Sequence, residues 1–126
     1  MRLLYVSAVS FGFIGALLSV AARANAVTEQ PFQTRVDVAT LVVIATASST
    51  EGGAGHVQYS VLKIDSVLKG SAPPTIRLVT TRFVAELNPL CCVVGSRYLL
   101  FLESTKDGSY VTVNGPFGAY LLGSKQ

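Results

Sequence analysis

The run Cys91–Glu103, CCVVGSRYLLFLE, decides the fold of this chain, because it holds the only two cysteines and leads into the most strand-like segment. Beyond Gly95 the alternating residues divide into two mostly apolar faces, one with Tyr98, Leu100 and Leu102 and the other with Leu99, Phe101 and Glu103. A strand that is apolar on both faces belongs in the middle of a barrel or sandwich. We therefore expect the other segments to wrap around it.

The first 26 residues have the pattern of a secretory signal peptide. One basic residue, Arg2, is followed by the apolar run 3–22 and by Ala-Asn-Ala at 24–26, with small residues at the positions that a signal peptidase reads. The apolar run approaches the ~20 residues of a membrane span, which leaves a retained membrane anchor as the alternative. We expect cleavage after Ala26 and a secreted or periplasmic mature chain of residues 27–126.

The mature part of the chain is long enough for one compact domain and too short for two. Its basic and acidic residues nearly balance, because Arg2 and Arg23 lie in the expected signal. The remaining Lys and Arg residues are scattered singly in the sequence, whereas nucleic-acid-binding proteins concentrate them on one face. We therefore expect no nucleic-acid partner.

Runs of β-branched and alternating apolar residues predict extended segments and little helix. We expect strands over 36–47, 56–69 and 75–82, the central strand ending near Glu103, and a partner strand over 110–113. We expect an extended lead-in over 27–35, a mobile hairpin loop over 48–55, and a tight hairpin at Asp107-Gly108. Over 83–90 we expect a plug or loop, in which Val84, Leu87 and Leu90 could lie along one side of a short helical turn. The inward parity slips along 56–69, which favours a bulged strand over the alternative of a helix.

These segments fit a five-stranded OB-like Greek-key barrel, that is, an all-β fold with a small α content. Periodicity alone would also fit a lipocalin-like or an immunoglobulin-like sheet. The choice between barrel and sandwich therefore stays open at the level of pattern.

Several short motifs resemble one known family. They are VATLVVIATA (38–47), YSVLKIDSVLKG (59–70), TIRLVT (75–80), CCVVGSRYLLFLE (91–103) and GPFG (115–118). Together they resemble the netrin-like or TIMP-like (tissue inhibitor of metalloproteinases) OB-fold domains of exported bacterial proteins, and the resemblance spans nearly all of 27–126. Animal inhibitors of this family chelate the protease zinc through a cysteine at the mature N-terminus. Here the expected first residue is Val27 and no cysteine precedes Cys91, so that wedge is absent.

The sequence contains little that points to catalysis or to a metal. His56 is the only histidine, and a metal site normally needs three or four clustered ligands, so we expect no metal and no cofactor. The spacing of the carboxylates indicates no acid–base pair, and there is no Gly-x-Ser-x-Gly motif. The best enzyme hypothesis is a thiol–imidazole pair of Cys91 or Cys92 with His56, but adjacent cysteines lack the C-x-x-C spacing of redox sites.

We therefore expect a non-catalytic binding protein whose partner is a protein or an envelope component. OB barrels usually bind on the face of the second and third strands and the loops beside it, which would place Tyr59, Lys63, Arg77 and Arg82 near a ligand. The alternatives are a protease-inhibitor-like protein without the N-terminal cysteine and a thiol-dependent enzyme or redox protein that uses the adjacent cysteines.

The fate of Cys91 and Cys92 is open at the level of sequence. Neighbouring Cα atoms lie ~3.8 Å apart, whereas disulfides prefer ~4.4–6.8 Å, which disfavours a bond between the two. Three outcomes remain: a vicinal ring, a bond to another molecule that would give a disulfide-linked dimer, and free thiols beside Val93 and Val94. Exposed thiols seldom persist in an oxidising compartment, so we expect oxidation and rank the intermolecular bond slightly ahead of the ring.

Overall fold

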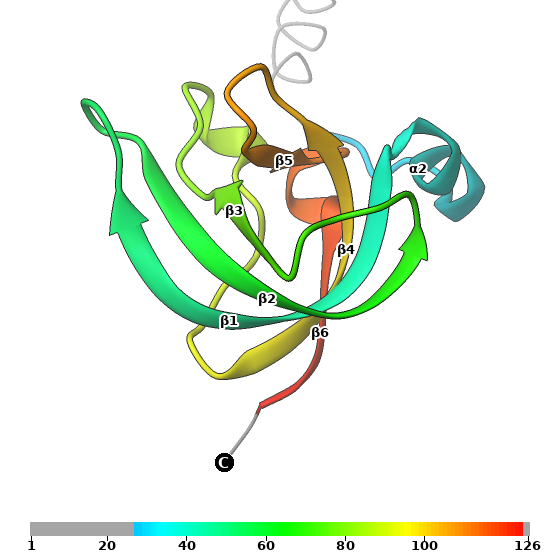
Figure 1. Cartoon of the computed structure of the whole chain (residues 1–126). Helices are drawn as coiled ribbons and strands as arrows, with labels where there is room; N and C mark the ends of the chain where they lie inside the picture. Colours follow the sequence, from blue (N-terminus) through cyan, green and yellow to red (C-terminus); the bar gives the residue numbers. More distant parts are fainter. Residues whose placement is uncertain (1–26, 125–126) are drawn as a thin grey trace, which may run out of the picture.

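Five strands close into a barrel in the part of the chain that the computed structural model describes, residues 27–124 (Figure 1). In chain order the elements are α2 (Phe32–Val38), β1 (Leu41–Gly52), β2 (Gln58–Lys69), β3 (Thr75–Val79), the 3₁₀ turn η1 (Ala85–Leu87), β4 (Ser96–Ser104), β5 (Tyr110–Thr112), the 3₁₀ turn η2 (Gly115–Gly118) and β6 (Ala119–Ser124). The expected all-β class, with a five-stranded barrel and a small helical content, is confirmed. The expected signal peptide lies outside the described residues.

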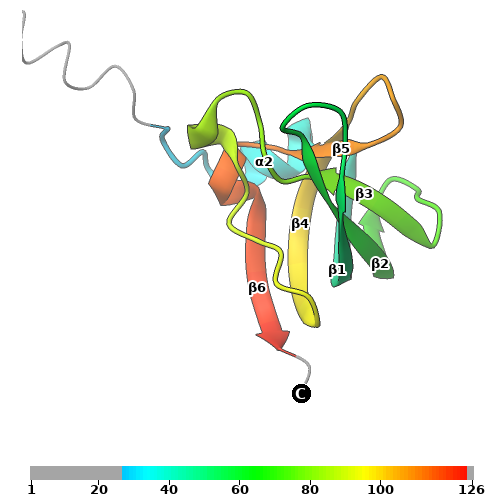
Figure 2. The same cartoon turned by 90° about the vertical axis from the view of Figure 1, so that its left-hand side faces the viewer.

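The barrel has the strand order β1-β2-β3-β5-β4 and is closed by pairing of β4 with β1. Because β4 returns to lie beside β1 after the consecutive strands β1 to β3, the order is that of a Greek key. The pairing of β3 with β5, at Leu78 and Tyr110, is parallel, and the other described pairings are antiparallel. The sixth strand, β6, pairs with the first half of β4 (Figure 2).

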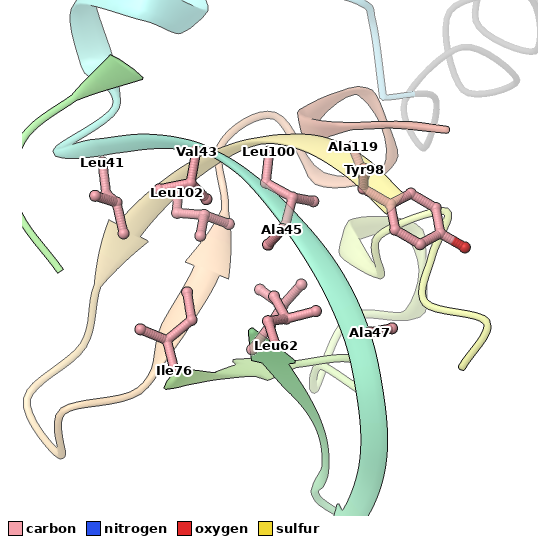
Figure 3. Packing of buried hydrophobic residues seen from close by; sticks show 11 residues of the cluster. Leu41, Val43, Ala45, Ala47, Leu62, Ile76, Tyr98, Leu100, Leu102 and Ala119 are labelled. Carbon is pink, nitrogen blue, oxygen red and sulfur yellow. The ribbon is translucent and has the colours of Figure 1, made fainter. Parts of the chain in front are cut away.

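The main core fills the barrel with the inward-facing residues of its strands (Figure 3). It consists of Leu41, Val43, Ala45, Ala47, Leu62, Ile76, Leu78, Tyr98, Leu100, Leu102 and Ala119. Of the two apolar faces expected for the central strand, β4, the one with Tyr98, Leu100 and Leu102 points into the barrel. Burial of these side chains is the main source of the free energy that holds the barrel together.

A second, smaller core lies outside the barrel, between β4 and α2. Phe101 points away from the main core and is fully buried with Ala39, Val42 and Val113. Its ring makes edge-to-face contacts with Phe32 of α2 and Tyr120 of β6, at centroid distances of 5.5 and 6.1 Å. The centre of β4 is thus buried on both faces, as the sequence predicted.

Arg35 of α2 fastens the segment before the helix to the end of the chain. Its buried guanidinium donates to the carbonyl of Phe117 at 2.7 Å and to the hydroxyl of Tyr120, and it forms an ion pair with Glu29 at 3.4 Å. The amide of Asn114 adds two bonds, because its Oδ1 accepts from the backbone of Gln30 and its Nδ2 donates to the carbonyl of Thr28. Residues 28–30 are therefore held against η2.

The prediction of an extended lead-in followed by a strand over 36–47 was wrong at its N-terminal end. The structure has helix over Phe32–Val38, and the strand begins only at Leu41. The β-branched Val36 and Val38 favour a strand locally, but a helix places Phe32 and Arg35 on one side, against Phe101. Tertiary packing therefore overrides local propensity in this segment.

The predicted loop over 48–55 is shorter than expected, because β1 continues to pair with β2 as far as Gly52. The reversal is confined to residues 53–57, which are closed by a hydrogen bond from Gly53 to Val57. The expected irregularity of β2 is confirmed, since its register with β1 shifts three times. The short helical turn is found at η1, the third strand ends earlier than expected, at Val79, and Gly108 has the positive φ of the expected hairpin.

Candidate binding face on strands β2 and β3

Three of the four residues expected near a ligand lie on the outer face of β2 and β3. Tyr59 and Lys63 lie on β2 and Arg77 on β3, and their immediate neighbours Ser60, Leu62, Ile76 and Leu78 point into the barrel. In the antiparallel register Arg77 lies opposite Val61, diagonal to Tyr59. Its guanidinium lies over the Tyr59 ring, with Cζ 4.7 Å from the centroid, which is a cation–π contact.

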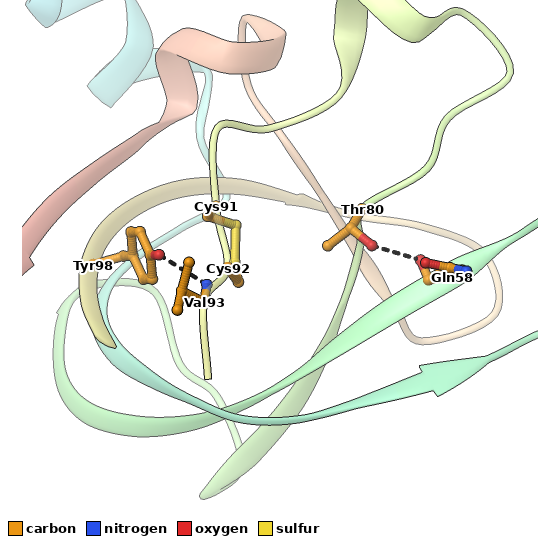
Figure 4. The surroundings of a disulfide bond; sticks show 6 residues. All are labelled: Gln58, Thr80, Cys91, Cys92, Val93 and Tyr98. Atoms are coloured by element: carbon orange, nitrogen blue, oxygen red, sulfur yellow. Dashed lines mark hydrogen bonds between the residues drawn. A yellow bond between two sulfur atoms is a disulfide. The ribbon is translucent and has the colours of Figure 1, made fainter. Parts of the chain in front are cut away.

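The fourth residue, Arg82, lies just beyond β3 in a segment that is fixed to the start of β2. The backbone N–H of Thr80 donates to the carbonyl of Gln58 at 2.9 Å, and the hydroxyl of Thr80 donates to the same carbonyl (Figure 4). The N–H of Gln58 donates to the hydroxyl of Thr81 at 2.7 Å. Arg82 is itself fixed, because its N–H donates to Asn88 Oδ1 at 2.6 Å.

The residue that follows this fixed segment, Phe83, is fully exposed, with a relative accessibility of 107%. Two cavities adjoin it. The larger, of about 430 Å³, is a shallow hollow that is wide open to solvent and is lined by Val57, Tyr59, Val79, Thr81, Arg82, Phe83, Thr105, Lys106, Asp107 and Ser109. The smaller, of about 320 Å³, is lined by His56, Val57, Thr81, Arg82 and Phe83. Because both cavities share Arg82 and Phe83, we call these two residues the Arg82–Phe83 ridge.

The hairpin between β4 and β5 borders the larger cavity with a carboxylate that is already hydrogen-bonded. Asp107 Oδ1 accepts from the hydroxyl of Ser109 at 2.6 Å, from the hydroxyl of Thr105, and from the N–H of Ser109 at 3.1 Å. These bonds, the one from the Ser109 hydroxyl first, hold the pKa of Asp107 far below its ordinary value, with a smaller attraction from Arg77. Asp107 is therefore ionised, and its Oδ1 is used within the hairpin.

The two cysteines pack against the main core. Cys91 and Cys92 are joined to each other by a disulfide, and the next residue, Val93, donates its N–H to the hydroxyl of Tyr98 at 2.9 Å (Figure 4). The structure contains the ring, one of the three outcomes that the sequence left open, whereas the sequence reasoning ranked the intermolecular bond slightly ahead. The disulfide-linked dimer stays a prediction.

A further cavity, of about 450 Å³, lies on another part of the barrel surface and was not anticipated from the sequence. It is lined by Thr46, Asp65, Arg97, Leu122, Gly123 and Ser124. Thr46 donates its hydroxyl to Asp65 at 2.7 Å, and Arg97 lies 3.8 Å from the same carboxylate oxygen. Its charged side chains are therefore paired with each other.

Sequence reasoning missed Phe83 and Lys106, which both line the larger cavity. The segment with Phe83 was expected to be a plug or loop, and an aromatic residue directly after a basic one in such a segment was the available signal. Across residues 27–124 no group of three or more His, Cys, Asp or Glu side chains could hold a metal ion. The same residues include no helix with the length and apolar character of a membrane span.

The fold defines the chain as a small β-barrel protein with an exposed aromatic and basic surface beside β2 and β3. No family model matches the chain, and no curated protein or solved structure was found to be similar to it.

Proposed function

We propose that this chain is a non-catalytic binding protein that docks a partner on the outer face of β2 and β3, at the Arg82–Phe83 ridge. The observation that carries the proposal is Phe83, a fully exposed aromatic side chain that directly follows a hydrogen-bonded segment. Aromatic residues and arginine are enriched where proteins contact one another and supply most of the binding energy there. A segment that is already fixed loses little conformational entropy on binding.

We further propose that the domain is of the TIMP-like or netrin-like OB type and that its partner is a protein or another component of the envelope. The strand order β1-β2-β3-β5-β4, closed through β1 and β4, supports an OB-type barrel. The signal-like sequence before Val27 supports export. The bond between Cys91 and Cys92 favours this function over a thiol-dependent enzyme, because neither sulfur is free to act as a nucleophile.

Site-specific photocrosslinking in the native compartment tests this proposal. A benzophenone amino acid replaces Phe83, and a matched control carries the same probe in place of Leu122, an exposed residue of β6 that lines the separate cavity with Asp65 and Arg97. We expect a discrete crosslinked product from position 83 that is lost when Arg77→Ala is added, and none from position 122. A probe at position 83 that yields no product, or the same product as position 122, would show that the ridge is not the docking site.

A further inference from the structure

The charged side chains of the barrel are distributed unevenly, although the described chain is electrically balanced. Residues 27–124 contain seven basic and seven acidic residues. Four of the basic side chains lie on the outer face of β2 and β3 or line its larger cavity: Lys63, Arg77, Arg82 and Lys106. The acidic side chains in the same region are Asp107, Glu51, which lies opposite Tyr59 in the register of β1 with β2, and Asp65, which follows Lys63 on the outer face of β2 but is bound by Thr46 and paired with Arg97. This face therefore carries an excess of positive charge.

Of these acidic side chains, Asp107 is already engaged in hydrogen bonds. Asp107 uses Oδ1 for its three bonds to Thr105 and Ser109, within its own hairpin. By contrast, the side chains of Arg82 and Lys106 form no hydrogen bond or ion pair with another residue in the range 27–124, and both residues line the larger cavity. Arg77 is stacked on Tyr59, which orients its guanidinium and leaves its N–H groups free to bind an anion.

The same region is also apolar. Phe83 is fully exposed, and Val57, Tyr59 and Val79 line the larger cavity beside the basic side chains. A ligand that offered only negative charge would leave these apolar surfaces in water, whereas a ligand that offered only apolar groups would bury the arginines without partners, which is costly. The surface thus matches a partner that carries carboxylates and apolar side chains side by side.

We propose that the docking partner presents an acidic protein segment, in which Asp or Glu side chains flank an aromatic or aliphatic residue. The apolar residue covers the Arg82–Phe83 ridge, and the carboxylates pair with Arg77, Arg82 and Lys106. This inference rests on the proposed function and adds the chemistry of the partner to it. A sulfated glycan would satisfy the basic side chains but not Phe83, and is therefore an outcome of the test rather than the proposal.

Selection of random peptides on the purified full-length chain tests the proposal and requires no candidate partner. We expect the enriched peptides to combine several Asp or Glu residues with an aromatic or aliphatic residue. Their affinity should fall at least about tenfold, or ~1.4 kcal/mol, in Arg77→Ala, Arg82→Ala and Phe83→Ser. The matched control is Arg97→Ala, which removes another exposed arginine from a different part of the barrel and should leave the affinity unchanged.

Peptide affinity at raised salt and the binding of heparin, a polyanion, distinguish the remaining outcomes of the test. Raising the salt from about 0.1 M to about 1 M shortens the Debye length from ~10 to ~3 Å, and should weaken the acidic peptides. If the enriched peptides are uncharged or keep their affinity at high salt, but no longer bind Phe83→Ser, the acidic segment is wrong and the docking site is still supported. Heparin binding that is lost in the arginine variants, without any enriched peptide, would overturn the acidic segment in favour of a glycan. Peptides that bind all three face variants as tightly as the wild type would overturn both this inference and the proposed function.

Discussion

Replacing Phe101 by alanine tests the second core, and with it the reason that α2 forms. Phe101 is fully buried and is in edge-to-face contact with Phe32 and Tyr120. Its ring also lies under the guanidinium of Arg35, with Cζ 5.8 Å from the centroid. The substitution therefore removes the side chain that joins the helix, the central strand and β6.

The expected loss is large for a domain of this size. Phe→Ala substitutions in cores cost about 3–5 kcal/mol, whereas the total stability of a small domain is about 5–15 kcal/mol. A cavity of about 180 Å³, lined by Phe32, Val36, Leu99 and other apolar residues, already adjoins Phe101. At about 4–8 °C per kcal/mol, Tm should fall by at least about 12 °C.

The chain supplies a matched control, because Phe83→Ala is the same chemical change at a fully exposed position. Urea denaturation followed by circular dichroism gives the free energy of unfolding of both variants. Phe83→Ala should change it by no more than about 0.5 kcal/mol, as most surface substitutions do. A loss below about 1 kcal/mol for Phe101→Ala, or equal losses in the two variants, would contradict the existence of a second core.

Four further expectations concern single positions. Leu100→Ala, in the main core, should cost about 2–5 kcal/mol, and an unchanged Tm would refute its burial. Gly118→Ala should destabilise strongly, because the added Cβ would overlap the carbonyl oxygen of Val113 and come within 2.8 Å of Thr112 Cβ, whereas Gly123→Ala meets nothing within 4 Å and should be close to neutral in the same denaturation assay. The folded-state pKa of Asp107 lies below its unfolded value of about 3.9, so its hydrogen bonds stabilise the fold above that pH and this stabilisation is lost on acidification. The difference in free energy of unfolding between wild type and Asp107→Asn should therefore shrink below about pH 4, and a difference that stays constant with pH would contradict this. Intact-mass measurement and non-reducing electrophoresis should show a monomer two protons lighter than the reduced chain if Cys91 and Cys92 are bonded to each other, and a reducible dimer would instead support the intermolecular bond.

The sequence predicted the central part of the fold because strand period and burial agree there. The alternation through β4 identified Leu100 and Phe101 as residues of opposite, buried faces, and both are fully buried. Helix α2 could not be predicted in the same way. It is held by a buried arginine and by contacts with Phe101 and Tyr120, which lie far away in the sequence, whereas its own valines favour a strand.

The candidate binding face, too, could be predicted from the sequence only in part. Tyr59, Lys63 and Arg77 could be placed from the sequence, because residues two apart on a strand share a face and the barrel class selects the face. The Arg82–Phe83 ridge could not be placed. Its position depends on the hydrogen bond between Gln58 and Thr81, which are 23 residues apart, and on the side chain of Asn88, and no local pattern encodes either contact.

The closure of the barrel through β1 and β4 also determines when this chain can fold. Thr40, at the start of β1, bonds to Leu102 of β4 across 62 positions, and the pairing continues to Thr46 and Arg97. Loop-closure entropy has to be overcome before such distant pairings contribute, so folding of this topology is slow compared with that of a helical bundle. A chain that emerges from the ribosome keeps one edge of β1 without its partner until residues beyond 100 have been made. The barrel is therefore assembled late, because its core cannot be fully buried before β4 has been made.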